Sequence, residues 1–108
     1  MTDALVVLCT CPDLKVAESL AGGLVGNGFA ACVNILPQIR SIYRWQSELH
    51  SDSEVLMIIK TNQQAYVKLE RWLLDNHPYD TPEVLALTVE AGAHNYLDWI
   101  DQATQRKK

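Results

Sequence analysis

Two of the three cysteines, Cys9 and Cys11, lie two positions apart at the end of a short apolar run. Side chains alternate between the two faces of a strand, so both thiols point to the same face if this run is extended. Cys32 lies in a second predicted strand and could approach them. Because soft thiolates select monovalent copper or zinc, the cysteines are candidates for a metal site. The alternative is that Cys9 and Cys32 are small core hydrophobes, the commoner role of an unpaired cysteine.

His77 is the second candidate ligand. It ends a predicted helix and opens a loop that contains Pro78, Asp80 and Glu83. An imidazole beside carboxylates suits a divalent ion. The alternative is structural, because a histidine at a helix C-terminus interacts favourably with the helix dipole and the proline then ends the helix. The local spacing alone favours this structural role.

Motifs of known enzymes are missing from the sequence. It contains no glycine-rich phosphate loop, no nucleophile elbow and no HExxH zinc motif. A Cys9–His77 nucleophile pair is conceivable, but the apolar surroundings of Cys9 would raise the pKa of its thiol and lower its reactivity. We therefore expect a binding protein rather than an enzyme. The other two histidines are expected to be solvated loop residues: His50 and His94.

Lys60 lies near aromatic residues at the ends of a predicted hairpin, among them Tyr43 and Trp45. Aromatic residues at such positions more often serve packing than ligand contacts. If they line a cleft between subunits, the lysine would suit a small anionic ligand there.

The composition bounds the class of protein. The chain has 108 residues, of which 48% are hydrophobic, so we expect one domain spanning 1–108. Its 9 basic and 13 acidic residues give a net charge of −4, which indicates no nucleic-acid partner. The first residues lack a cationic region and the apolar run after them is short, so no signal or membrane segment is expected. Three cysteines without a secretory context indicate reduced thiols and a cytoplasmic protein.

The elements that position these residues begin with an apolar run at 4–9, which predicts a central strand. Apolar side chains at helical spacing then predict a helix from Asp13, which favours the helix N-terminus, to Asn27. Gly22 and Gly23 each weaken this helix by about 1 kcal/mol, so packing must hold it, and they would let another backbone approach closely.

The chain is organised around residues 29–61, which predict two long strands joined by a turn at Gln46 and Ser47. Pro37 lacks the N–H that a ladder needs and therefore predicts a bulge, an edge or a bend. Strands of this length would protrude from a domain of this size.

Thr61 and Gln64 have the spacing of a capping box and predict the start of a second helix, which must end before Pro78. Residues 83–90 predict a fourth strand. A short third helix follows, with apolar side chains at helical spacing: Tyr96, Leu97, Ile100 and Ala103.

The predicted order is strand, helix, strand, strand, helix, strand and C-terminal helix. This is the α+β split βαβ arrangement called ferredoxin-like, here with a long protruding β-hairpin. Right-handed crossovers place both main helices on one face of the sheet. Three stretches are nevertheless apolar at successive positions and hence on both faces: 5–9, 55–59 and 84–87. A bare apolar face exceeds what a soluble monomer tolerates, so we expect a closed cyclic assembly of identical chains.

Six blocks, in order and spread over nearly the whole chain, resemble the CutA divalent-ion tolerance family: 8–13 (LCTCPD), 30–34 (AACVN), 43–45 (YRW), 59–61 (IKT), 77–83 (HPYDTPE) and 96–100 (YLDWI). The resemblance implies a ferredoxin-like homotrimer, cytoplasmic in bacteria, with a role in tolerance of copper and other divalent ions. It also implies a likeness to the nitrogen-regulatory signalling trimers, so the alternative function is a signalling module that binds a small anionic ligand between subunits. One departure is Ser47, where the family usually has glycine, so a different turn type is expected.

The resemblance also implies a copper site that includes Cys9 and His77, to which we add Glu83 as a supporting ligand. The second departure lies here, because Asn76 stands where the family has another histidine. An amide is a poor copper ligand, which weakens the case for tight binding of divalent copper. Cys11 is an additional thiol that could compensate.

Overall fold

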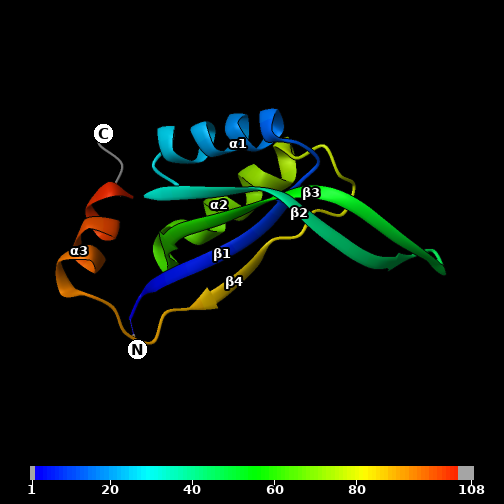
Figure 1. Ribbon diagram of the computed structural model, residues 1–108. Helices are drawn as coiled ribbons and strands as arrows, with labels where there is room; N and C mark the ends of the chain where they lie inside the picture. Colours follow the sequence, from blue (N-terminus) through cyan, green and yellow to red (C-terminus); the bar gives the residue numbers. More distant parts are fainter. Residues whose placement is uncertain (1, 105–108) are drawn as a thin grey trace.

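The computed structural model describes residues 2–104, and within them the predicted order of elements is confirmed. The bounds in chain order are β1 Ala4–Cys11, α1 Leu14–Gly26, β2 Cys32–Trp45, β3 Glu48–Asn62, α2 Gln63–Asn76, β4 Leu85–Thr88 and α3 His94–Ala103. The strands form one antiparallel sheet in the order β2-β3-β1-β4 (Figure 1). Each βαβ unit is therefore split by a strand of the other unit, since β3 separates β1 from β2 and β1 separates β3 from β4.

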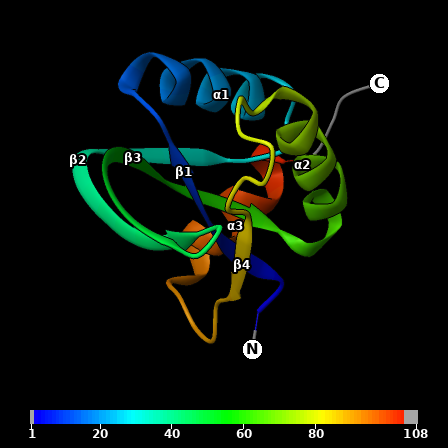
Figure 2. The ribbon, with the colours of Figure 1, turned by 90° about the vertical axis from the view of Figure 1, so that its right-hand side faces the viewer.

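Helices α1 and α2 cover the same face of the sheet, as predicted (Figures 1 and 2). The main core lies between them and the sheet. Its largest fully buried apolar side chains come from α1, α2, β1 and β3: Leu24, Met57, Ile59, Leu69, Leu73, Val7, Cys9 and Cys11. Helix α3 lies at the end of the sheet opposite the hairpin turn (Figure 1), where Ile100 packs with Ala4 and Ala31.

Helix α1 begins as predicted, because the Asp13 carboxylate accepts a hydrogen bond from the Val16 N–H at 2.8 Å. The two glycines inside it differ. A Cβ on Gly23 would lie 2.3 Å from the Trp72 ring, whereas a Cβ on Gly22 would meet nothing within 4 Å. The predicted close approach therefore exists only at Gly23, and the neighbour there is an α2 side chain rather than a backbone.

The predicted irregularity at Pro37 is a β-bulge. The register of β2 against β3 shifts between Leu36 and Ile39, because β2 advances by three residues there while β3 advances by two. Gln38 adopts a φ of 62° to accommodate the extra residue. The hairpin bends here and extends beyond the body of the domain (Figure 1).

The hairpin turns at Gln46 and Ser47, as predicted. Both residues have positive φ values, 51° and 68°. This is the requirement of a type I′ turn, which glycine or asparagine meets with less strain than glutamine or serine.

The predicted capping box at Thr61 is wrong by one residue. Asn62 caps α2, because its side-chain oxygen accepts the Ala65 N–H at 3.0 Å. Thr61 still belongs to β3, and its buried hydroxyl donates to the Phe29 carbonyl oxygen at 2.7 Å. The helix starts later because the ladder between β1 and β3 continues to the pair Ala4 and Asn62.

Strand β4 is shorter than predicted, with Leu85–Thr88 in place of 83–90. Its ladder with β1 involves only Leu5–Leu8, and Val84 packs against the main core instead of joining the ladder. All four residues of β4 are exposed in the single chain. The reason is that the main helix contacts fall on β1, β2 and β3.

The face of the sheet opposite α1 and α2 carries apolar side chains that no helix of the described chain covers fully. Cross-strand partners share a face, so the register identifies its members. We call this surface the open face: Val6, Leu8, Leu56, Ile58, Leu85 and Leu87. Leu85 and Leu87 are 58% and 52% exposed. The predicted bare apolar face is therefore present.

Candidate metal centre

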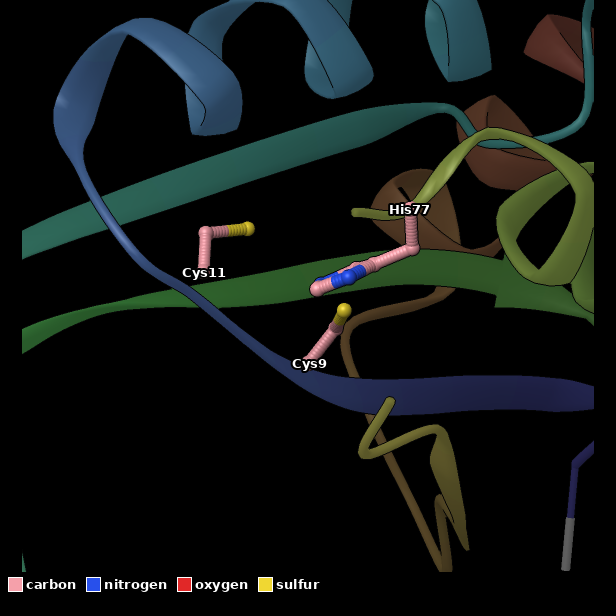
Figure 3. Close-up of side chains that lie close together, drawn as sticks. All are labelled: Cys9, Cys11 and His77. Carbon is pink, nitrogen blue, oxygen red and sulfur yellow. The ribbon is translucent and has the colours of Figure 1, made fainter. Parts of the chain in front are cut away.

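Three side chains that could bind a metal ion meet between the sheet and the helices. Cys9 and Cys11 lie in β1, and His77 follows α2; one ligand atom of each lies within 4.8 Å of the others. Figure 3 shows the imidazole ring reaching toward the two sulfur atoms. All three residues are buried.

The alternation of β1 explains why both thiols face inward. Cys9 lies opposite Met57 of β3, Cys11 lies opposite Val55, and these partners are also buried. The predicted common face of the two cysteines is thus confirmed, and it is the helix-covered face. The strand continues two residues beyond the predicted end, to Cys11, because β3 is long enough to pair with it.

Both ring nitrogens of His77 are hydrogen-bonded to the backbone. The Tyr79 N–H donates to Nδ1 at 3.1 Å, and Nε2 lies 2.8 Å from the Thr10 carbonyl oxygen. Since Nδ1 accepts, the proton of a neutral ring is on Nε2, which donates to Thr10. The His77 N–H also donates to the Leu73 carbonyl oxygen at 2.8 Å, so the residue is the C-cap of α2, as its structural interpretation predicted.

The two thiols are hydrogen-bonded to each other, and this separates their acidities. The hydrogen bond with Cys11, together with burial, raises the pKa of the Cys9 thiol. The same bond lowers the pKa of the Cys11 thiol. The sequence prediction that Cys9 is a poor nucleophile agrees with the raised pKa.

Glu83 does not join this cluster. It lines a cleft of about 660 Å³ with the following residues: Thr10, Ser41, Ile42, Tyr43, Trp45, Asp52, Glu54, Tyr79, Asp80 and Thr81. Thr10 and Glu54 belong to the face of the sheet opposite the thiols, because their neighbours Cys11 and Val55 face the helices. The sheet therefore separates Glu54 from the sulfur donors, and the charges of Glu83 and Glu54 still contribute to raising the pKa of the Cys9 thiol.

The cleft of the single chain is acidic. Four carboxylates and no lysine or arginine are among the lining residues in the part of the chain described. The Tyr79 hydroxyl donates to Glu54 at 2.6 Å, and the Tyr43 hydroxyl donates to Asp52. Lys60 does not line this cleft, and its ammonium group donates to Asn34. A small anion would meet repulsion here, so any anionic ligand needs a different cleft.

The remaining candidate residues lie apart from the cluster. Cys32 is half-buried at the start of β2, opposite Lys60 and thus on the other face of the sheet. Asn76 is exposed, and its amide donates to the Trp72 carbonyl oxygen at 2.8 Å. In this conformation the Asn76 amide does not add a metal ligand to those of the two thiols.

The two other histidines differ from expectation. His50 belongs to β3, not to a loop, and its ring stacks on Tyr43 with centroids 5.3 Å apart. His94 is solvated as expected but is the first residue of α3, where it lies 3.2 Å from Asp98.

From the sequence alone, Cys11 has only an accessory role as a ligand. The sequence could not identify the two backbone partners of His77. The alternation of β1 was the available signal for Cys11, whereas Thr10 lies 67 positions from His77. Two sulfurs and one imidazole form a donor set for thiophilic or borderline ions. The residues therefore fit a soft metal ion better than a hard one.

Comparisons with known proteins identify the same family over most of the chain. The family model for the CutA1 divalent ion tolerance protein matches residues 5–103. The Divalent-cation tolerance protein CutA of Thermus thermophilus is 46% identical over 99 residues, which cover 92% of this chain and 96% of that protein. Protein CutA of Mus musculus is 47% identical over 96 residues, which cover 89% of this chain but only 54% of the mouse protein. The chain thus spans about half the length of that relative.

A solved structure shows the same fold. The structure of the divalent cation tolerance protein Cut A1 from Thermus thermophilus superposes with a TM-score of 0.92 at 44% identity, covering 94% of this chain and 99% of that one. Within residues 2–104, no helix combines the length and apolar character needed to cross a bilayer.

Proposed function

The chain belongs to the CutA1 divalent ion tolerance family, and from this premise we propose that it binds metal ions and contributes to metal tolerance by holding them, without turnover. The relatives supply the link to divalent cations through their names. The site supplies the chemistry, because its donors are those of a copper or zinc ligand set.

The meeting of Cys9, Cys11 and His77 within 4.8 Å is the observation that carries this proposal. Cys9 and His77 were the expected ligands. Cys11 joins them in this cluster, whereas Glu83, the proposed supporting ligand, lines the neighbouring cleft.

We further propose a homotrimer of ferredoxin-like subunits. The open face supports self-association, because an apolar surface of this kind needs a cover in water. The protruding hairpin could extend the sheet of a neighbouring subunit, and a closed ring would leave no strand edge unpaired. The three free cysteines suit a reducing compartment, so we place the protein in the cytoplasm.

The test is an anaerobic titration of the reduced protein with Zn(II) and with Cu(I), with each ion buffered by a competing chelator. We expect one ion per subunit and loss of this binding in Cys9→Ala, a substitution that keeps a small apolar side chain in the core. Cys32→Ala is the matched control and should bind like the wild type. Wild-type protein that binds neither ion would refute the proposed function.

A further inference from the structure

We propose that the ion selected by this site is monovalent copper, held by the thiolates of both Cys9 and Cys11, while His77 positions the strand and is not a ligand. This inference rests on the proposed function and adds the identity of the ion and of its donors. It assigns Cys11, which the sequence treats as an accessory thiol, a role equal to that of Cys9.

The first step of the argument is the placement of the sulfur atoms. They come from alternate residues of one strand, both are fully buried, and they lie within 4.8 Å of each other. Two sulfurs on opposite sides of one ion are separated by roughly 4.6 Å, twice the metal–sulfur bond of about 2.3 Å seen in zinc sites. The pair can therefore hold an ion between its sulfurs with little movement of β1.

The second step concerns the imidazole. A neutral histidine binds a metal through its unprotonated nitrogen. In His77 that nitrogen is Nδ1, and it already accepts the Tyr79 N–H, while the protonated Nε2 donates to Thr10. Binding a metal would break one of these contacts and leave a backbone group without its partner. The ring is thus better suited to fixing the Thr10 carbonyl, which lies between the two cysteines in β1.

The third step excludes other donors. Glu54 and Glu83 line the neighbouring cleft, and neither belongs to the group whose ligand atoms lie within 4.8 Å of one another. Asn76 is exposed and already hydrogen-bonded. Structural zinc sites take four ligands, whereas the soft donors that the described residues bring together here are the two thiols. Monovalent copper accepts two soft ligands, so it matches the donors that are available.

The experiment compares Cu(I) and Zn(II) affinities of the reduced full chain by competition with chromophoric chelators. Wild-type protein should bind Cu(I) more tightly than Zn(II) and show the near-ultraviolet absorption of copper–thiolate bonds. Cys11→Ala should lose more Cu(I) affinity than the roughly 10–100-fold that removal of an outer-shell partner costs. X-ray absorption at the copper edge should report sulfur neighbours and no imidazole.

His77 is tested with two variants. His77→Gln keeps an N–H donor that can reach Thr10 but has no imidazole, so Cu(I) affinity should fall no further than the outer-shell range of roughly 10–100-fold. His77→Ala lacks the donor and should bind more weakly than His77→Gln. Thermal unfolding of each variant identifies any that fails to fold, and the absorption spectrum of the wild type tests the donors independently.

Three results separate the two proposals. Wild-type protein that binds an ion while Cys11→Ala binds it equally well would overturn this inference and leave the proposed function standing. The same holds if imidazole appears in the copper spectrum. Wild-type protein that binds no ion would overturn both.

Discussion

Two backbone hydrogen bonds hold the His77 imidazole, and the donor of one of them, Tyr79, also reaches the opposite face of the sheet. Its N–H donates to His77, while its hydroxyl donates to Glu54 of β3 at 2.6 Å. Burial, and then the bond to Glu54, raises the pKa of the Tyr79 phenol. This residue therefore links the loop after α2 to β3.

We predict that Tyr79→Phe lowers the free energy of unfolding by about 1 kcal/mol at neutral pH, the usual worth of one hydrogen bond. Because the phenol pKa is raised in the folded protein, its contribution is complete below about pH 10 and is lost as pH rises from there through the folded pKa. Urea unfolding at pH 7 and above pH 10 should show the difference between wild type and Tyr79→Phe shrinking with pH.

Tyr43→Phe is the control for this measurement. The Tyr43 hydroxyl also donates to a carboxylate, that of Asp52, but the side chain lies on the exposed hairpin. Its removal should leave the free energy of unfolding close to that of the wild type, because the hydrogen bond is exposed to solvent. Equal effects of both substitutions at pH 7 would show that Tyr79 does not fasten the loop.

At the scale of elements, the packing of α1 on α2 depends on a single glycine. We predict that Gly23→Ala destabilises the protein by about 1–3 kcal/mol, because the new methyl group would lie 2.3 Å from the Trp72 ring and force it to move. Gly22→Ala has open space and should instead stabilise by up to about 1 kcal/mol through helix propensity. Thermal or urea unfolding of the two variants checks the opposite signs.

The contrast between the two glycines could not be predicted from the sequence, because they are the same residue type and differ only in their surroundings. Gly22 and Gly23 are equivalent as helix formers. They differ only in whether an added Cβ would point toward Trp72. If both alanine variants were stabilising, the Trp72 ring would have to relax freely, and the close contact would not limit the packing of the helices.

Local rules predicted those elements whose signals lie within a few residues. Pro37 indicated the bulge, and Asp13 indicated the start of α1, because each acts on its own backbone or on the next turn. The start of α2 and the length of β4 were wrong, since pairing with β1 decides both. The candidate site follows the same division: one strand predicted the common face of Cys9 and Cys11, whereas the position of His77 depends on packing across the sheet.

At the scale of the whole molecule, the sheet has one face sheltered by α1 and α2 and one that is open. The open face was predicted from apolar residues at successive positions of three strands. Its exposure in the single chain is greatest on β4, at Leu85 and Leu87. Replacing one of these leucines by a charged residue tests self-association separately from the stability of the subunit.

We predict that wild-type protein sediments at three times the 12.1 kDa subunit mass and that Leu87→Glu dissociates it. A carboxylate on the open face would have to be buried without a partner in the assembly, which costs several kcal/mol per subunit. Val67→Glu is the matched control, because Val67 is 64% exposed but lies on α2, away from the open face. That variant should remain assembled. Sedimentation velocity at micromolar concentration distinguishes the outcomes: a monomeric wild type would refute the trimer, and a trimeric Leu87→Glu would place the subunit contacts somewhere other than the open face.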